Sequence, residues 1–220
     1  MRIALTGGIA CGKSLAAKFF RELGVQTLDA DDVVHELEAP GGAAVSAIVS
    51  RFGQSVLAHD GGIDRSRLAE IVFAGGAQLV ATDARRDLEA ILHPLVRQRL
   101  LDFASAAFHV DLQPPTTNSQ LSTLNLRLSI IPLLFESHFE SDYDTILCVS
   151  STEDRQIDRM MRTRGYTRAQ AEARLAAQMP MAEKAARADW TIQNDSTVEE
   201  LKAEVQRCAA WLIGRMEKAE

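Results

Sequence analysis

Long hydrophobic runs are missing from this chain of 220 residues. A membrane helix needs roughly 18 consecutive apolar residues, and the longest apolar stretch, residues 130–135, has the length of a strand. The apolar start of the chain meets glycines after five or so residues, which is too short for the apolar region of a signal peptide. We therefore expect no membrane association and a cytoplasmic protein.

Cysteine pairs and an excess of positive charge are also missing. The three cysteines are an odd number at unrelated spacings, so neither a disulfide framework nor a zinc spacing is present, and we expect a reducing compartment. The net charge of −6 argues against non-specific nucleic-acid binding, because phosphate neutralisation supplies the affinity of such proteins. A phosphorylated small molecule can still bind where positive charge is local.

The composition that remains is that of a globular protein. Hydrophobic residues make up 46% and charged residues 25%, which excludes collagen, disorder and a coiled coil. Short apolar runs alternate with longer helical patterns, and this predicts βαβ units with a parallel sheet. The expected strands are Arg2–Thr6, Val25–Asp29, Leu128–Leu134, Thr145–Ser150 and Asp189–Gln193.

Helical patterns fill the stretches between these strands. The gap between the second and third strands is far longer than the dozen or so residues of a simple crossover, so we expect a helical insertion there. Residues 111–125 are polar and read as a surface loop. The expected helices are 13–23, 31–37, 65–73, 94–108 with Pro94 in its first turn, a helix opened by a capping box at Thr167–Gln170 and ending near 179, and 197–216.

Residues Gly7–Ser14, with the sequence GGIACGKS, fit the phosphate-loop pattern G-x-x-x-x-G-K-[ST] between a strand and a helix. Successive backbone N–H groups and the helix N-terminus stabilise an anion at one spot. The Lys13 ammonium reaches β- and γ-phosphates, and the Ser14 hydroxyl is suited to Mg²⁺. We predict nucleoside triphosphate binding by Gly8, Ile9, Ala10, Cys11, Gly12, Lys13, Ser14 and Leu15.

Two interpretations of Cys11 stay open at this point. The helix N-terminus favours a reactive thiolate, which would make Cys11 a redox switch. The alternative is a small residue that simply fits the loop.

Neither of the GTPase patterns D-x-x-G and N-K-x-D is present, and the closest approach to an acidic Walker-B strand end has only Glu136. This favours a small-molecule kinase with an arginine-rich lid. Residues 155–168 contain five arginines and only one acidic residue, and an expected break between two helices lies at 163–166. Such arginines neutralise charge in a phosphoryl-transfer transition state. The cluster comprises Arg155, Arg159, Arg162, Arg164 and Arg168.

The second expected strand ends in an acidic group, Asp29-Ala30-Asp31-Asp32. Ligands of open α/β sheets bind at the carboxyl ends of strands, so one of these carboxylates is suited to accept the proton of an attacking hydroxyl. Another is suited to cap the helix that follows. His35 lies one helical turn after Asp31, where it contacts the acceptor or is an ordinary surface histidine.

Seven segments in chain order make the sequence similar to the dephospho-CoA kinase family. Beyond the phosphate loop and Asp29–His35, they are Asp60–Arg65 with Leu68 and Val72-Phe73, Leu92–Leu95, Pro132–Glu136, Ala177–Met179, and Ala188-Asp189 with Ile192 and Asn194. The sequence departs from the family pattern at Ala10, Cys11 and Thr163, where glycine, serine and arginine are more usual.

The resemblance implies phosphorylation of the ribose 3′-hydroxyl of dephospho-CoA by ATP with Mg²⁺, the last step of coenzyme A synthesis. It implies a P-loop NTPase three-layer α/β core with a five-stranded parallel sheet, an inserted helical acceptor domain and a helical lid. The expected core is 1–30, 109–152 and 180–220, the acceptor domain 31–108 and the lid 153–179.

The resemblance and the residue patterns together assign the site residues. Asp31 is the candidate base and also contacts the acceptor, and Asn194 lies near the adenine of ATP. The other expected roles are catalysis by Lys13, Arg162 and Arg164, acceptor binding by His35, Arg65 and His93, and Mg²⁺ binding by Ser14. We expect a monomer or weak homo-oligomer. The rival hypotheses are a kinase for a nucleoside monophosphate or a sugar, and a nucleotide-sensing module without transfer chemistry.

Overall fold

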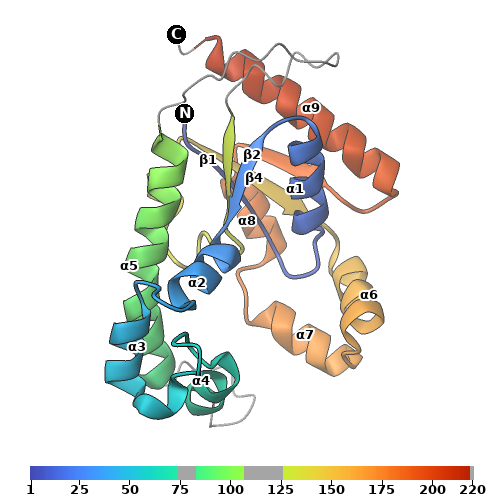
Figure 1. Cartoon of the computed structure of the whole chain (residues 1–220). Helices are drawn as coiled ribbons and strands as arrows, with labels where there is room; N and C mark the ends of the chain where they lie inside the picture. Colours follow the sequence, from blue (N-terminus) through green and yellow to red (C-terminus); the bar gives the residue numbers. More distant parts are fainter. Residues whose placement is uncertain (74–82, 107–125, 219–220) are drawn as a thin grey trace. The chain divides into compact units, whose positions relative to one another are not determined.

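The computed structural model describes residues 1–73, 83–106 and 126–218, and it divides the chain into two compact units (Figure 1). The first unit comprises Met1–Leu28 and Phe103–Glu220, and the second comprises Asp29–Asp102. The second unit is thus an insertion in the sequence of the first. The expected loop at 111–125 and the glycines at 75–76 lie outside the described residues.

A five-stranded parallel sheet forms the centre of the first unit, as the sequence predicts. Its strands run in the order β2 (Gln26–Asp29), β3 (Arg127–Ile130), β1 (Ile3–Gly7), β4 (Thr145–Ser150) and β5 (Trp190–Gln193). Ile3 of the central strand pairs with Leu128 on one side and Thr145 on the other. The first loop therefore leaves the middle of the sheet, with strands on both sides of it.

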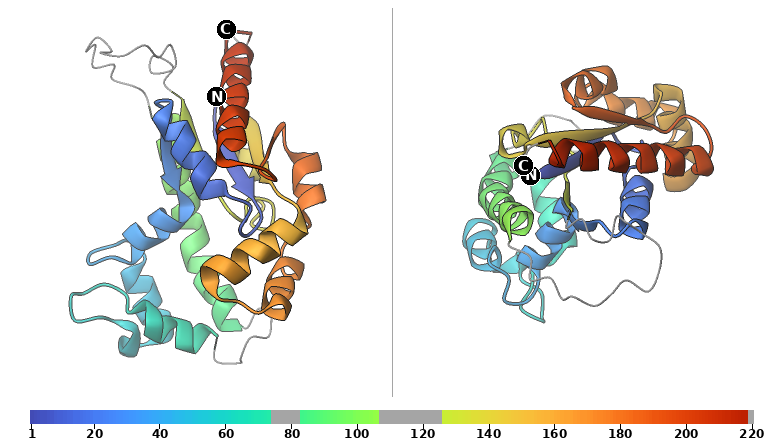
Figure 2. Two further views of the ribbon diagram at one scale, coloured as in Figure 1. Left: turned by 90° about the vertical axis from the view of Figure 1, so that its right-hand side faces the viewer. Right: turned by 90° about the horizontal axis from the view of Figure 1, so that it is seen from above.

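Helices cover both faces of this sheet. Helix α1 (Lys13–Glu22) packs beside α9 (Val198–Met216), and their buried side chains join Ile3, Leu5 and Leu147 in one core. Helix α8 (Met181–Arg187) packs against β1 and β4 (Figure 2). This arrangement confirms the three-layer α/β core that the sequence predicts.

Two helices of the first unit form the arginine-rich segment. They are α6 (Glu153–Arg164) and α7 (Arg168–Ala176), and Gly165 between them adopts a left-handed conformation at φ 65°. Thr167 and Gln170 make the expected capping box at the start of α7. Helix α7 ends three residues before the predicted Met179, so residues 177–180 remain outside any helix.

The second unit is helical in the part that the structure describes. It contains α2 (Ala30–Glu38), α3 (Val45–Phe52), the 3₁₀ turn η1 (Gln54–Val56), α4 (Arg65–Val72) and most of α5 (Asp83–Ser105). Ile48, Val56 and Leu68 are buried. An isolated bridge between Leu57 and Ile63 closes the loop ahead of α4.

Two predicted elements are wrong in their bounds. The third strand ends at Ile130 instead of Leu134, because Pro132 has no N–H to donate to a ladder and the chain turns there. The helix expected to begin near Pro94 begins at Asp83 and carries Pro94 in its interior. Within the described ranges, no helix is both long and apolar enough to cross a membrane.

Candidate active site

The phosphate loop connects β1 to α1, and Gly12 adopts the left-handed conformation at φ 94°. Within the described part of the chain, no acceptor is present for the backbone N–H groups of Ala10, Gly12, Lys13 and Ser14. Four free donors within five residues, at the start of a helix, are the features of an anion-binding loop. The loop is therefore suited to hold the phosphates of a nucleotide.

Side chains from α6 and from the end of β5 bind two carbonyl groups of the loop. Arg159 Nη1 donates to the carbonyl of Ala10 at 3.2 Å, and Asn194 Nδ2 donates to that of Cys11 at 2.7 Å. In a planar trans peptide the carbonyl and the next N–H point in opposite directions. Holding these two carbonyls therefore orients the N–H groups of Cys11 and Gly12 away from the two donors.

Asn194 also lies against the glycine that ends the loop. A Cβ atom added to Gly12 would lie 2.0 Å from Asn194 Nδ2, so no side chain fits there. Asn194 is buried at the end of β5, and its own N–H donates to the carbonyl of Ser150. The structure thus places Asn194 in contact with the phosphate loop, while its expected role near adenine stays a prediction.

The predicted loop residues differ in what they offer to a ligand. Lys13 Nζ donates to the Gly7 carbonyl at 3.1 Å, and Ser14 is exposed. The N–H of Leu15 is already bonded to the Gly12 carbonyl. The N–H groups of Gly8 and Ile9 donate to Met181 Sδ and Gln178 Oε1. Among the described residues, the open donors are therefore the N–H groups of Ala10, Gly12, Lys13 and Ser14.

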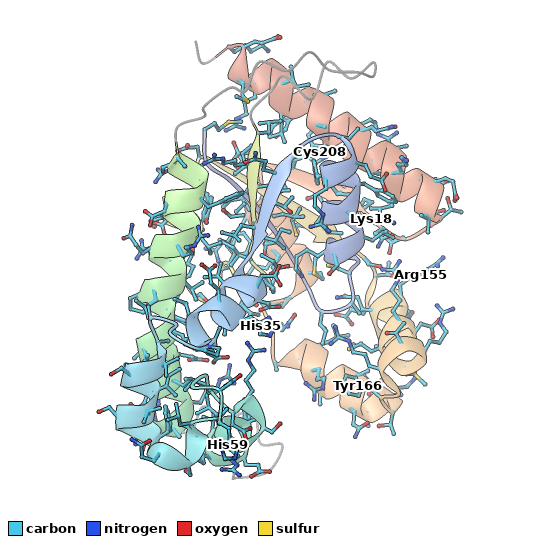
Figure 3. All side chains as sticks on the ribbon, in the orientation of Figure 1. Lys18, His35, His59, Arg155, Tyr166 and Cys208 are labelled. Atoms are coloured by element: carbon cyan, nitrogen blue, oxygen red, sulfur yellow. The ribbon has the colours of Figure 1, made fainter. Side chains whose placement is uncertain are left out.

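Cys11 is fully buried beneath the loop. Its Sγ lies 2.8 Å from the position that a Cβ atom on Gly7 would occupy, so it fills the space under the first glycine. This packing favours the small-residue interpretation over a redox switch. Cys148 and Cys208 are buried as well, and Figure 3 places Cys208 on α9.

We expect none of the three thiols to react rapidly with an alkylating agent in the native protein. Burial raises the pKa of Cys148 to about 12 and also raises the pKa of Cys208, so both stay protonated at pH 8. Thiol counting at pH 8, with and without denaturant, checks this expectation. One fast native thiol, mapped to Cys11 by mass spectrometry, would restore the redox interpretation.

Of the five clustered arginines, Arg159 is the one that contacts the phosphate loop. Its guanidinium also donates to the carbonyl of Asn194 at 2.7 Å and to Ser151 Oγ at 3.3 Å. Arg162 and Arg164 are exposed, and Arg168 pairs with Glu172 at 3.6 Å. Figure 3 shows Arg155 on α6 and Tyr166 at the break between α6 and α7. Arg162 and Arg164 are thus left with free guanidinium groups in the described structure.

The expected acceptor residues belong to the second unit. Asp29 caps α2, because its carboxylate accepts the N–H of Asp31 at 3.0 Å, while the side chain of Asp31 is exposed. His35 is exposed on the same helix (Figure 3). Arg65 pairs with the buried Glu38 at 2.8 Å, and His93 is half-buried on α5. Capping therefore falls to Asp29, and the Asp31 carboxylate has no partner among the described residues.

Known proteins are similar to this chain in both sequence and fold. The dephospho-CoA kinase (CoaE) family model matches residues 1–200. The chain belongs to the dephospho-CoA kinase family. It is 40% identical to a dephospho-CoA kinase of Geobacillus kaustophilus, over 93% of each chain. It is 37% identical to one of Streptomyces avermitilis, over 98% of this chain and 95% of the relative.

A solved structure has the same fold as this chain. A protein of Thermus thermophilus, known from its crystal structure, superposes with a TM-score of 0.68 at 29% identity. The superposition covers 96% of both chains. As a family member, the chain is a kinase built on a P-loop nucleotide-binding fold. Kinases of this kind take ATP as the phosphoryl donor.

In this member of the dephospho-CoA kinase family, sequence reasoning missed several residues that bind the phosphate loop or anchor the segment after α7. In the sequence, Arg159 is one of five clustered arginines, and Gln178, Met179 and Glu136 belong to family segments that indicate no role for them. Gln156 and Lys184 carried no signal at all, because one glutamine or lysine in a helix is ordinary. Gln178 does have a sequence signal, because it lies in the short family segment Ala177–Met179, just before Pro180.

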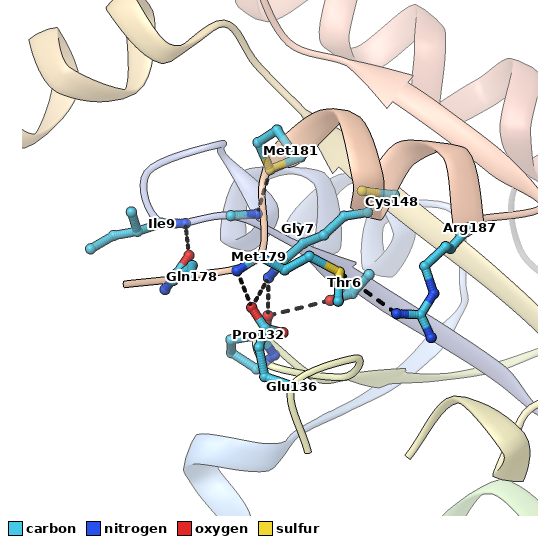
Figure 4. Close-up of polar contacts among 12 residues, drawn as sticks. Thr6, Gly7, Ile9, Pro132, Glu136, Cys148, Gln178, Met179, Met181 and Arg187 are labelled. Carbon is cyan, nitrogen blue, oxygen red and sulfur yellow. Dashed lines mark hydrogen bonds and ion pairs between the residues drawn. The ribbon is translucent and has the colours of Figure 1, made fainter. Parts of the chain in front are cut away.

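Figure 4 shows the contacts that fix residues 177–180, the segment after α7, in this chain. Glu136 Oε1 accepts the N–H of Met179 at 3.0 Å and pairs with Lys184 Nζ at 2.7 Å. Lys184 is fully buried and also donates to the carbonyl of Pro132 at 3.5 Å. The turn after β3 therefore anchors Met179, which lies between Gln178 and Met181 in the sequence. These two side chains accept N–H groups of the phosphate loop.

We expect Glu136→Gln to destabilise the protein by about 3–5 kcal/mol, because it leaves the buried Lys184 ammonium without its carboxylate. The free energy of unfolding from urea titration measures this loss. Combining Glu136→Gln with Lys184→Met removes both charges and is expected to recover part of the stability. An unchanged urea midpoint in the single variant would contradict the described pairing.

Proposed function

We propose that this chain transfers the γ-phosphoryl group of ATP to the ribose 3′-hydroxyl of dephospho-CoA, giving coenzyme A and ADP. The observation that carries the proposal is the match of residues 1–200 to the dephospho-CoA kinase family in a chain with open phosphate-loop donors. We further propose that the enzyme is cytoplasmic and is a monomer or weak homo-oligomer, with no nucleic acid or membrane as a partner.

The nucleotide side of the reaction is assigned to the first unit. The free N–H groups of the loop bind the phosphates, and Lys13 Nζ leaves the Gly7 carbonyl to donate to them. Arg162 and Arg164 neutralise the charge that develops as the phosphoryl group is transferred. The protein forms no covalent intermediate in this scheme, because positioning and electrostatic stabilisation supply most of the rate enhancement in phosphoryl transfer.

The acceptor side is assigned to the second unit. Asp31 accepts the proton of the ribose 3′-hydroxyl while the hydroxyl oxygen attacks the γ-phosphorus of ATP. The bond from that phosphorus to the β–γ bridging oxygen breaks, and ADP leaves. Its free carboxylate suits this role, since Asp29 already caps the helix. His35, Arg65 and His93 are proposed to bind the acceptor.

The residues around the loop fit a Mg²⁺ ion that is held mainly by phosphates and water. Ser14 offers an exposed hydroxyl at the start of α1, and no group of three or more histidine, cysteine, aspartate or glutamate residues that could hold a metal ion occurs in the described ranges. Mg²⁺ typically takes one or two protein ligands and substrate phosphates. When bound, the ion supplies neutralisation of the β- and γ-phosphate charge.

Turnover over a panel of acceptors tests the proposed function. ADP release is measured with ATP and dephospho-CoA, nucleoside monophosphates, shikimate or gluconate. We expect release with dephospho-CoA at least 100-fold faster than with the others. Release with a nucleotide or sugar acid but not with dephospho-CoA would overturn the assignment, and ATP binding without any transfer would indicate a sensing module.

Replacing Arg162 or Arg164 with alanine is expected to lower kcat by about 10-fold or more, and Arg168→Ala by less than about twofold. The first two guanidinium groups are exposed and have no partner in the described ranges, whereas Arg168 pairs with Glu172 at the surface. Steady-state kinetics of the three variants make the comparison. Equal and small effects at all three positions would mean that the basic cluster is only a solvated helix face.

A further inference from the structure

Both polar backbone groups of Ile9 are bound by glutamine side chains from the two ends of the segment that contains α6 and α7. Gln156 Nε2, in α6, donates to the Ile9 carbonyl at 2.6 Å. Gln178 Oε1, just after α7, accepts the Ile9 N–H at 3.0 Å, as Figure 4 shows. One residue of the phosphate loop is therefore held by both ends of the arginine-rich segment.

The packing around this contact is tight. A Cβ atom added to Gly8 would lie 2.7 Å from Gln156 Nε2 and 2.6 Å from Met181 Sδ. Gln156 is fully buried, and its Oε1 has no hydrogen-bond partner among the described residues. A buried amide oxygen without a hydrogen-bond partner lowers the stability of the fold. A contribution to stability alone therefore does not explain a glutamine at position 156.

The consequence for the loop follows from peptide geometry. The Ile9 carbonyl and the Ala10 N–H belong to one planar peptide and point in opposite directions. Drawing the carbonyl toward Gln156 therefore turns the Ala10 N–H to the other side. That N–H is the first of the four free donors of the loop.

We propose that Gln156 and Gln178 are positioning residues that hold Ile9 from both sides and so orient the Ala10 N–H toward the nucleotide phosphates. The pair ties both ends of the arginine-rich segment to the phosphate loop. The inference rests on the proposed binding of ATP at this loop, and it concerns nucleotide affinity instead of the choice of acceptor.

Matched glutamate variants separate the two roles, because a carboxylate accepts hydrogen bonds but does not donate them at pH 8. Gln178→Glu keeps the acceptor for the Ile9 N–H, whereas Gln156→Glu removes the donor and sets a negative charge against a carbonyl oxygen. Each adds one negative charge beside the same residue, so their difference reports the hydrogen bond. Gln206→Glu, exposed on α9, is the charge control.

The readouts are the dissociation constant of ADP, the melting temperature, and kcat and KM for ATP. We expect Gln178→Glu and Gln206→Glu to bind ADP within about threefold of the parent, and Gln156→Glu to bind it at least about tenfold more weakly. Parent-like affinity in Gln156→Glu, or equal weakening in both loop variants, would overturn the proposal.

A neutral variant covers the case in which the buried carboxylate introduced by Gln156→Glu prevents folding. Gln156→Met keeps the length of the side chain and removes its unpaired oxygen together with the donor. We expect an unchanged or raised melting temperature with ADP affinity lowered about tenfold. A lowered melting temperature with unchanged affinity would show a purely structural role. ADP binding needs no acceptor, so failure here is distinct from absence of dephospho-CoA turnover in the parent.

Discussion

Replacing Asp31 with asparagine is expected to lower kcat by about 10²–10⁴ while ATP still binds, since general base catalysis contributes about that much. The asparagine amide has nearly the same size but does not take up the proton of the attacking hydroxyl. The helix should not suffer, because the cap of α2 uses the Asp29 carboxylate and the backbone N–H of Asp31. Steady-state kinetics with dephospho-CoA, together with an ATP titration, measure both effects.

The neighbouring aspartate provides the control for this experiment. Asp32 is also exposed in the first turn of α2, and Asp32→Asn removes the same charge from the same helix end. We expect less than about a threefold change in kcat there, because a charge near a helix N-terminus has a modest effect. Full activity of Asp31→Asn, or equal losses in both variants, would remove Asp31 from the role of base.

The second large effect is expected at Lys13. Lys13→Met keeps the aliphatic length but removes the ammonium group that neutralises the transferring phosphoryl group, and we expect kcat to fall by about 10²–10³. The apparent KM for ATP should rise as well. The measurement is single-turnover transfer from labelled ATP, which separates the chemical step from product release.

Lys18→Met supplies the matched control, because Lys18 is exposed on the same helix, where Figure 3 marks it. It should leave both constants within about twofold of the parent. A similar loss in the two variants would show that net positive charge on α1, and not the position of Lys13, drives the reaction.

Much of the fold is visible in the sequence because its signals are local. The run Ile3–Thr6 followed by GGIACGKS at residues 7–14 specifies a strand, an anion-binding loop and a helix through glycine conformation and apolar periodicity. The capping box at Thr167 is equally local and is confirmed. The expected domain bounds and site roles, including that of Asp31, stay predictions.

The remainder depends on contacts between residues distant in sequence. Pro132 ends β3 early, and its carbonyl accepts hydrogen bonds from Thr6 and Lys184. The sequence around Pro132 predicts neither contact. Pro94 is tolerated inside α5, where local rules favour a helix start. The binding of Ile9 by Gln156 joins residues 147 positions apart. Local patterns contain no information on such pairings.

Phosphorus NMR of the product tests the central claim most directly. The account predicts that ATP and dephospho-CoA give ADP and one new phosphomonoester resonance, with scalar coupling to the proton on the ribose 3′ carbon. A resonance coupled to the 2′ position, or inorganic phosphate as the only new signal beside ADP, would contradict it.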